Sequence, residues 1–313
     1  MKKGKIFLIL IAIILVGIGV ALVVVGYKNR PKSETKENTY EVTESFNNIN
    51  FDIQTADLKF EKATDDKVKL VCVENAYVTN EIKVENNTLK VTSKENRKWY
   101  EFLYFNFTKY KITLYLKEEV YDNLNTVSST GDIEIPNNFT FNNVKMELST
   151  GKINLNAKVL DKLNMSASTG KITVNNVSLK EAEIKASTGD IKLSNMNVSN
   201  DLKINTSTGD VELNNVNAKN IEIKTSTGDM ELIKTIAIDH MELSASTGHI
   251  HFDEADAKTI KAKTSTGKVY GVLNTPKTFY ATSDTGKISV PKTTGGECEI
   301  TTHTGSITIT IKE

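Results

Sequence analysis

The sequence predicts an all-β protein, most of which is a single-stranded parallel β-solenoid of 19 to 20 residues per coil, β-helix-like, preceded by one N-terminal transmembrane helix. Three observations predict this fold. A Thr-Gly pair recurs in register over residues 130–305, apolar and polar residues alternate between the pairs, and an uncharged apolar stretch opens the chain. A fixed period this short is typical of a solenoid, in which each repeat forms one coil and stacks on the preceding coil.

Glycines mark one position of the repeat. Successive glycines are 19 or 20 residues apart, and eight of the ten complete the tripeptide Ser-Thr-Gly. Side-chain parity changes between Thr188 and Ile191, so the chain bends at Gly189. Such a bend often requires a positive φ, which glycine adopts without steric cost. We therefore expect a column of structural turn glycines, formed by Gly131, Gly151, Gly170, Gly189, Gly209, Gly228, Gly248, Gly267, Gly286 and Gly305.

The alternation assigns one face of each strand to the interior. Leu202, Ile204 and Thr206 alternate with polar residues before a repeat glycine, and the same parity recurs in the neighbouring coils. Because successive side chains of a strand point to opposite faces, these residues must point inward together. Each coil is expected to contain three short parallel strands, with coils about 4.8 Å apart.

Asparagines predict a second turn in three consecutive coils. Asn176, Asn195 and Asn215 each lie six residues after a repeat glycine. Asparagine tolerates left-handed backbone geometry, and stacked copies can hydrogen-bond along the array.

The N-terminal stretch predicts a membrane anchor. Ile6 to Val25 is an uncharged run of 20 apolar or small residues, long enough to cross a bilayer as a helix. No small-x-small cleavage site follows, and no cysteine directly follows for a lipid anchor, which favours an uncleaved helix over a signal peptide. The positive charges before and after this stretch are nearly balanced, so they do not decide its orientation in the membrane. A short amino end is most easily left in the cytoplasm. We expect a cytoplasmic tail over residues 1–5, a transmembrane helix over 6–26 and a linker over 27–39.

Both ends of the array depart from the regular repeat. The frame extends loosely upstream, where Thr55-Ala56-Asp57 has alanine in place of glycine. Residues 40–127 are therefore expected to be degenerate coils that cap a regular solenoid over 128–313. At the other end Pro276, Pro291 and Lys312 suit a closing edge that must not recruit another strand.

Composition excludes several classes of partner and site. Lysine plus arginine and aspartate plus glutamate number 39 each, and only two arginines occur, so nothing favours a nucleic acid. Cys72 and Cys298 each continue an apolar alternation and are expected to be buried thiols. No cofactor is expected.

The repeated Ser-Thr-Gly-Asp-Ile motif resembles the bacterial "putative adhesin" family, a domain of unknown function with repeats of this type. The copies that match are residues 129–133 and 187–191, with 207–211 close behind. The resemblance covers residues 40 to 313 and implies a β-solenoid, in some members membrane-bound and linked to envelope-stress operons. It implies no catalytic residues.

The residues that follow the repeat glycines form one ladder along the solenoid. Asp190, Asp210 and Asp229 are consecutive in it, about 4.8 Å apart. Carboxylates at that distance repel one another and could attract Ca²⁺, or they could form a solvated row neutralised by its neighbours. The serines and threonines near the turns could bind ice or sugar hydroxyls, or they could satisfy backbone groups. The chain has four histidines, His240, His249, His251 and His303, which are expected to be surface residues.

An aromatic segment interrupts the repeat frame. It is either a plug for the open amino end of the core or a surface that binds a partner or the membrane interface. Its candidate residues are Trp99, Tyr100, Phe102, Tyr104, Phe105 and Phe107, followed by Tyr110.

The sequence favours a non-catalytic binding or structural module of the bacterial cell envelope. We expect a single-pass membrane protein with its C-terminal domain outside the cytoplasm, whose partner is an envelope protein or a cell-wall polymer. The alternatives are an accessory or sensor protein in envelope-stress signalling and a carbohydrate-active β-helix enzyme. The enzyme is disfavoured because no nucleophile-base pattern emerges and no arginine follows Arg97.

Overall fold

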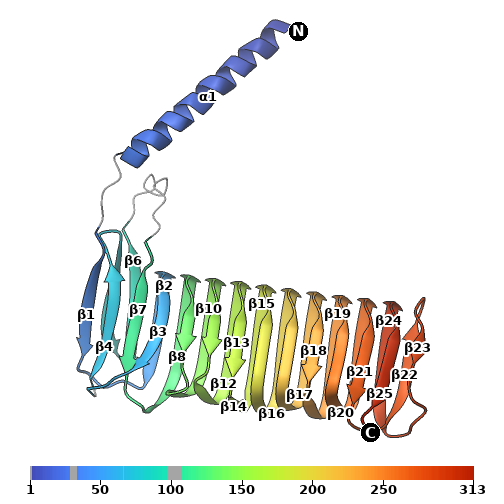
Figure 1. Ribbon diagram of the computed structural model, residues 1–313. Coiled ribbons are helices and arrows are strands. Elements are labelled where there is room, and N and C mark those ends of the chain that lie inside the picture. Colours follow the sequence, from blue (N-terminus) through green and yellow to red (C-terminus); the bar gives the residue numbers. More distant parts are fainter. Residues whose placement is uncertain (1, 29–33, 66, 97–107) are drawn as a thin grey trace.

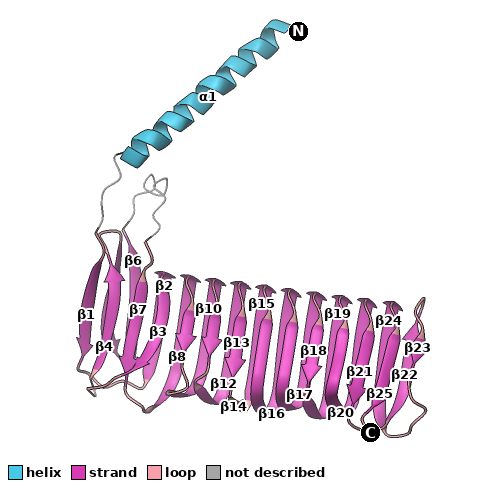
Figure 2. Cartoon of the chain, in the orientation of Figure 1, coloured by secondary structure: helices cyan, strands magenta, loops and turns pink. Residues whose placement is uncertain are grey.

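The computed structural model describes residues 2–28, 34–65, 67–96 and 108–313 (Figures 1 and 2). In these residues it contains one helix, α1 (Lys2–Lys28), and 25 strands joined into a single sheet. The strands are predominantly parallel and wind into a long solenoid, so the predicted all-β solenoid is confirmed.

The helix differs from what the sequence predicted. A membrane span was expected over residues 6–26, and α1 covers this segment, with every described side chain of residues 10–25 exposed. Within the residues that the structure describes, however, no helix combines the length and apolarity that crossing a bilayer requires.

The N-terminal part of the sheet contains nine strands. Their bounds are β1 Lys36–Val42, β2 Asn48–Thr55, β3 Asp57–Lys62, β4 Val68–Glu74, β5 Val78–Glu85, β6 Thr88–Glu95, β7 Lys111–Leu116, β8 Val120–Thr130 and β9 Ile133–Ile135. The regular coils follow, with bounds β10 Thr140–Thr150, β11 Ile153–Leu155, β12 Lys158–Thr169, β13 Ile172–Asn175, β14 Ser178–Leu179, β15 Glu181–Thr188, β16 Ile191–Thr208, β17 Val211–Thr227, β18 Met230–Ile233, β19 Ile236–Thr247, β20 Ile250–Thr266, β21 Val269–Leu273, β22 Lys277–Ser283, β23 Ile288–Ser289, β24 Gly296–Thr304 and β25 Ile307–Ile311.

Two faces of the sheet run the length of the solenoid. One face has the order β1-β4-β7-β3-β9-β11-β13-β16-β17-β18-β20-β21-β25-β23. The other has the order β5-β6-β2-β8-β10-β12-β15-β16-β17-β19-β20-β24-β22. Strands β16, β17 and β20 belong to both faces because each continues around the corner between them.

The N-terminal cap is not built from parallel coils alone. β2 and β3 follow the repeat frame and pair in parallel with β8 and β9. In contrast, β1 and β7 pair antiparallel with β4, and β5 with β6, so the expectation of degenerate coils over 40–127 does not describe these strands. Lys36 to Thr39 also belong to β1, whereas the sequence placed them in a linker.

The core lies between the two faces, as the alternation predicted. Leu202 and Ile204 are fully buried and Thr206 is nearly so, and the inward residues of the coils form one continuous cluster. Nearer the cap, Phe60 makes edge-to-face contacts with Phe51, Phe139 and Phe141. Burying these rings contributes to stability in proportion to their apolar area, about 25 cal/mol per Å².

The repeat glycines form a column for a steric reason beyond turn geometry. Eight of the ten have φ between +136° and +158°, but Gly267 and Gly286 do not. At all ten, an added Cβ would lie 1.7 to 2.2 Å from a carbonyl oxygen of the neighbouring coil. For Gly131 that oxygen belongs to Ala56, which places β2 and β3 directly under the first regular coil. Close approach of neighbouring backbones therefore requires glycine throughout the column.

The predicted asparagine turns are confirmed. Asn176, Asn195 and Asn215 have φ of 59°, 53° and 56°, and the amide of each later residue donates to the side-chain oxygen of the one before it, at 3.2 and 2.8 Å. The same turn position is occupied in the next two coils by Lys234 and Glu254, also at positive φ.

The last two coils are exchanged in space. We expected each coil to stack on the preceding one, but β24 and β25 pair with β20 and β21 on one side and with β22 and β23 on the other. The C-terminal segment therefore lies between two coils that precede it in the sequence. Lys312 is not at the closing edge, and its ammonium contacts the Glu254 carboxylate at 3.0 Å.

Candidate binding surfaces

The aspartates that follow the repeat glycines connect neighbouring coils. The Oδ1 atom of each of Asp190, Asp210 and Asp229 accepts a hydrogen bond from a backbone N–H of the next coil, at 3.2, 2.8 and 2.7 Å respectively. Asp57 and Asp132 do the same for the first regular coils, at 2.9 and 2.8 Å. These bonds satisfy donors at a corner where no strand ladder reaches them.

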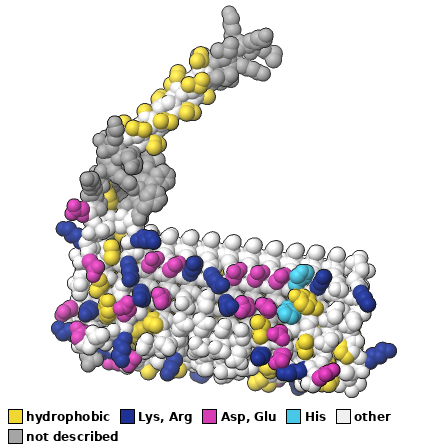
Figure 3. Space-filling view, in the orientation of Figure 1, with side chains coloured by type: hydrophobic (Ala, Val, Ile, Leu, Met, Phe, Trp, Pro, Cys, Tyr) yellow, Lys and Arg dark blue, Asp and Glu magenta, His cyan; other side chains and the backbone are white. Residues whose placement is uncertain are grey.

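The structure gives no support for calcium at this row. In the described parts of the chain, no group of three or more histidine, cysteine, aspartate or glutamate side chains is placed to hold a metal ion. The sequence correctly placed these carboxylates one above another, and their partners are the backbone amides. Figure 3 shows acidic and basic side chains alternating in blocks along this face, with histidines toward the C-terminal end.

His249 continues the same ladder with a different acceptor. Its Nδ1 accepts the backbone N–H of Lys268 at 2.9 Å, which requires that Nδ1 carry no proton. Two residues on, the His251 ring stacks on Tyr270, with centroids 4.6 Å apart, and its Nδ1 lies 3.4 Å from the Glu231 carboxylate. These two imidazoles therefore make structural contacts on the surface.

A shallow groove of about 540 Å³ crosses four coils on the other face of the solenoid. It lies over β12, β15, β16 and β17, and its walls carry hydroxyl, amide and ammonium groups. Lys185 is paired with Glu183 at 2.6 Å, and Lys224 with Glu222 at a shorter distance. The lining residues are Ser166, Ala167, Ser168, Lys185, Ala186, Ser187, Asn205, Thr206, Ser207, Lys224, Thr225 and Ser226.

The sequence pointed only to the hydroxyl groups of this groove. Its serines lie two and four residues before a repeat glycine, positions whose side chains face outward when the inward parity is fixed. Aligning those positions over successive coils would have placed Lys185, Asn205 and Lys224 beside the serines. Their convergence into one groove depends on the corner geometry, which the sequence alone does not give.

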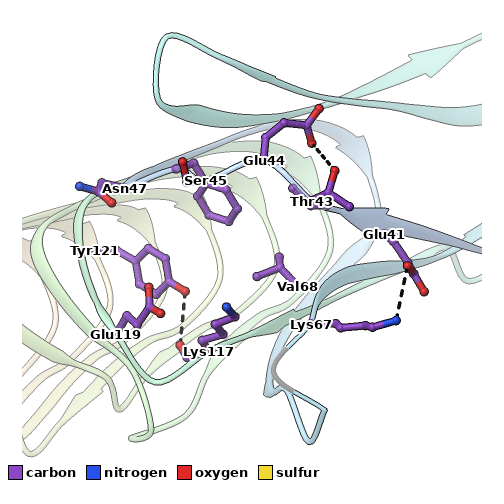
Figure 4. A pocket seen from close by; sticks show the side chains of 12 residues that line it. Glu41, Thr43, Glu44, Ser45, Asn47, Lys67, Val68, Lys117, Glu119 and Tyr121 are labelled. Atoms are coloured by element: carbon purple, nitrogen blue, oxygen red, sulfur yellow. Dashed lines mark hydrogen bonds and ion pairs between the residues drawn. The ribbon is translucent and has the colours of Figure 1, made fainter.

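A second pocket, of about 490 Å³, lies at the end of the cap (Figure 4). Phe46 and Tyr121 stack with centroids 6.0 Å apart, and the Tyr121 hydroxyl donates to the Lys117 carbonyl at 3.3 Å. Burial raises the pKa of the Tyr121 hydroxyl above its ordinary value. Charged groups surround the opening, where Lys67 lies 3.9 Å from Glu41. Acidic and basic groups are mixed here, so the pocket presents no field of one sign.

The aromatic candidates Trp99, Tyr100, Phe102, Tyr104, Phe105 and Phe107 lie outside the residues that the structure describes. Tyr110, which follows them, is buried, and its hydroxyl accepts the side-chain amide of Asn75 at 2.8 Å. The choice between plug and partner surface for residues 99–107 stays a prediction.

The fold and these surfaces define a β-solenoid repeat protein that presents fixed rows of polar side chains. The chain belongs to the Toastrack DUF4097 family, whose model matches residues 46–204 and 196–313. The resemblance noted in the Ser-Thr-Gly-Asp-Ile motif is thereby confirmed.

The solved structures to which the chain is similar are distant in sequence. One, a "putative adhesin" from Bacteroides fragilis, is 17% identical, with 90% of this chain and 99% of that chain covered and a TM-score of 0.42. A "putative lipid binding protein" from Parabacteroides distasonis is 20% identical, with 89% and 98% covered and a TM-score of 0.48. A "putative adhesin" from Parabacteroides merdae is 16% identical, with 89% and 97% covered and a TM-score of 0.39. No curated protein matches the chain.

Proposed function

We propose that this protein is a non-catalytic binding module of the bacterial cell envelope that holds an extended, neutral glycan strand of the cell wall in the groove across β12, β15, β16 and β17. The observation that carries the proposal is the groove of about 540 Å³, in which a serine recurs at one position of all four coils beside a second polar residue that varies. A polymer with a regular chain can contact such a surface through many weak hydrogen bonds whose contributions add.

The chemistry of the lining favours a polyhydroxylated ligand over a polyanion. Serine hydroxyls can donate to and accept from sugar hydroxyls, and the Asn205 amide offers both functions. The two lysines of the groove are already paired with glutamates, so they leave little uncompensated positive charge for phosphate or carboxylate groups.

The lining also favours binding over hydrolysis. Glycoside hydrolysis ordinarily uses two carboxyl groups flanking the scissile bond, one as acid and one as base or nucleophile. The residues that line the groove contain no aspartate, glutamate or histidine. A glycan held there would meet no carboxyl or imidazole group among the lining residues, which supports a structural or adhesive role.

We further propose that α1 attaches the protein to a lipid membrane, with the solenoid on the outer side. Leu15, Val16 and Val23 are each more than 60% exposed, and all described side chains of residues 10–25 are exposed. Apolar surface of this extent is costly in water and is stabilised by contact with acyl chains. Full-length protein should sediment with membranes, whereas a chain lacking residues 1–33 should not. Recovery of the full chain in the soluble fraction would contradict the attachment.

Co-sedimentation with insoluble peptidoglycan tests the groove. Detergent-solubilised full-length protein should sediment with the polymer, and Ser187→Tyr combined with Ser207→Tyr should weaken binding at least tenfold by filling the groove. The matched control is Ser246→Tyr with Ser265→Tyr, which changes the same repeat position outside the groove and should bind like the wild type. Equal loss in both pairs, or no binding by the wild type, would refute the proposal.

A further inference from the structure

The two ends of the solenoid protect their edge strands differently. At the cap, the edge strand β5 carries Glu81, Lys83 and Glu85 on its exposed side, with Lys83 2.9 Å from Glu85. Exposed charges of this kind discourage another strand from pairing with an edge. At the C-terminal end, the edge strands are β22 and β23.

β22 carries no exposed charge. Its one charged residue, Lys277, is turned inward and only 3% exposed, with its ammonium 2.5 Å from the Asp256 carboxylate. Thr278, Tyr280 and Thr282 form its outward face, and Tyr280 is 57% exposed. β23, by contrast, has only two residues and is soon followed by Pro291. Shortness therefore protects β23 and not β22, which has seven residues and whose nearest proline, Pro276, precedes the strand without interrupting it.

The core is also incompletely covered at this end. In the described sheet, β22 pairs with β24 only. At its first residue, the Lys277 backbone N–H and C=O bond the Thr293 hydroxyl, at 3.3 and 2.8 Å, and beyond Lys277 the outer backbone groups of β22 have no strand partner. Phe279 and Ala281 pack against the core but are only partly buried, whereas Cys298 and Ile300, their register partners one coil inward, are fully buried. A strand added outside β22 would complete both the hydrogen-bond ladder and the burial of these side chains.

We propose that β22 pairs antiparallel with β22 of a second copy, so that two solenoids join through their C-terminal edges. A two-fold axis through Tyr280 would place Phe279 opposite the partner's Ala281 and Thr278 opposite the partner's Thr282. The first pair sets a large inward side chain against a small one, and the second pairs two residues that favour strands.

The same geometry selects a second copy as the occupant. An uncharged strand that faces itself across a two-fold axis brings no like charges together, and the contact closes at two copies. Pairing of β22 with the cap of another copy would instead set it against the charged edge strand β5 and would extend without limit. The inference is independent of the glycan groove, which lies on other coils.

Cysteine cross-linking of the full-length protein in detergent tests the pairing. Tyr280→Cys should form an intermolecular disulfide under mild oxidation, giving a species of twice 34.7 kDa on non-reducing gels. Ile238→Cys is the matched control, because Ile238 is 69% exposed but lies on β19, inside the array, and it should stay monomeric. The native thiols do not interfere, since both are buried.

A charge at the axis supplies the converse test. Light scattering should show a dimer for the wild type, and Tyr280→Lys should raise the dimer dissociation constant at least tenfold, because two ammonium groups would face each other. An unchanged melting temperature of the monomer would show that the variant still folds. A monomeric wild type overturns the proposal, as does equal cross-linking of both cysteine variants. A dimer that survives Tyr280→Lys and fails to cross-link at position 280 also overturns it, since the two copies would then not meet through β22.

Discussion

Gly305 packs directly against Gly267, although Gly286 lies between them in the sequence. A Cβ at Gly305 would lie 1.9 Å from the Gly267 carbonyl oxygen, and one at Gly286 would lie 1.7 Å from that of Gly305. Two side-chain hydrogen bonds join the same pairs of coils. The Thr302 hydroxyl donates to the Gly267 carbonyl at 3.0 Å, and the Ser283 hydroxyl donates to the Gly305 carbonyl at 2.9 Å. The final strands therefore enter between two coils made earlier in the chain.

The crossing that permits this insertion uses two adjacent glycines. A Cβ at Gly295 would meet the Pro276 carbonyl oxygen at 2.0 Å, and one at Gly296 would meet that of Lys258 at 2.2 Å. Neither contact can be relieved by a flexible side chain, because each involves backbone. The inserted segment thus passes through a gap that admits only glycine.

Engineered disulfides test the coil order. Lys261 and Glu299 are register partners on β20 and β24, so Lys261→Cys with Glu299→Cys should form an intramolecular bond, since neighbouring strands are about 4.8 Å apart. Lys261→Cys with Tyr280→Cys should not, because β24 lies between these strands. Mass spectrometry of tryptic peptides would detect either disulfide. A bond between positions 261 and 280, with none between 261 and 299, would show that the coils stack in the order of the sequence.

Lys234→Asn should stabilise the protein by about 0.5–1 kcal/mol. Lys234 has φ of 47° at the position where Asn176, Asn195 and Asn215 precede it, and asparagine tolerates this conformation better than lysine. The new amide could also donate to Asn215, extending the hydrogen-bonded ladder. Thermal and urea unfolding would measure the gain. Lys219→Asn, an exposed change outside this turn, is the control, and an equal gain there would show that the turn is not the cause.

Lys277→Met should lower the free energy of unfolding by about 3–5 kcal/mol. The Lys277 ammonium lies 2.5 Å from Asp256 and also donates to the Ala257 carbonyl at 2.7 Å and the Thr275 hydroxyl at 2.8 Å. Its removal leaves a buried carboxylate without a cation, which costs more than the loss of one favourable contact. Adding Asp256→Asn should recover part of the loss in urea unfolding. A double variant no more stable than Lys277→Met would show that packing, and not the unpaired charge, causes the effect.

The buried thiols should make stability fall at high pH. Burial raises the pKa of Cys72 and of Cys298 from 9.0 to about 12. Between these values the unfolded chain has released both protons while the folded chain keeps them, so the free energy of unfolding decreases as pH rises, by about 1.4 kcal/mol per pH unit for each thiol. Below pH 9 the two thiols contribute no such dependence.

Urea unfolding from pH 8 to 11 would measure this slope. In the double variant Cys72→Val with Cys298→Val, the free energy of unfolding should fall less steeply with pH, because the contribution of the two thiols is removed. The slope that remains in that variant comes from other titratable groups. The same burial predicts that the folded protein reacts slowly with a thiol reagent at pH 8 and rapidly in urea. Rapid labelling of the folded protein would contradict the assigned burial.

The regular coils could be predicted because their determinants are local. The spacing of the glycines fixed the period, the alternation around Ile204 fixed the inward face, and the asparagines at 176, 195 and 215 fixed the left-handed turns. The aspartates were placed correctly in a row, but their partners were missed, because the amide that each accepts comes from the neighbouring coil, 19 or 20 residues away.

What the sequence by itself determined is the coil: its length, its interior and its corners. Only the tertiary structure decided which coil lies against which, because coils with the same inward pattern offer nearly the same contacts and can exchange places. The position of β24 between β20 and β22 is accommodated by the glycine crossing at 295–296, where any side chain would meet a backbone carbonyl. The antiparallel cap was decided in the same way, because strand direction depends on distant pairings and not on the alternation within a strand.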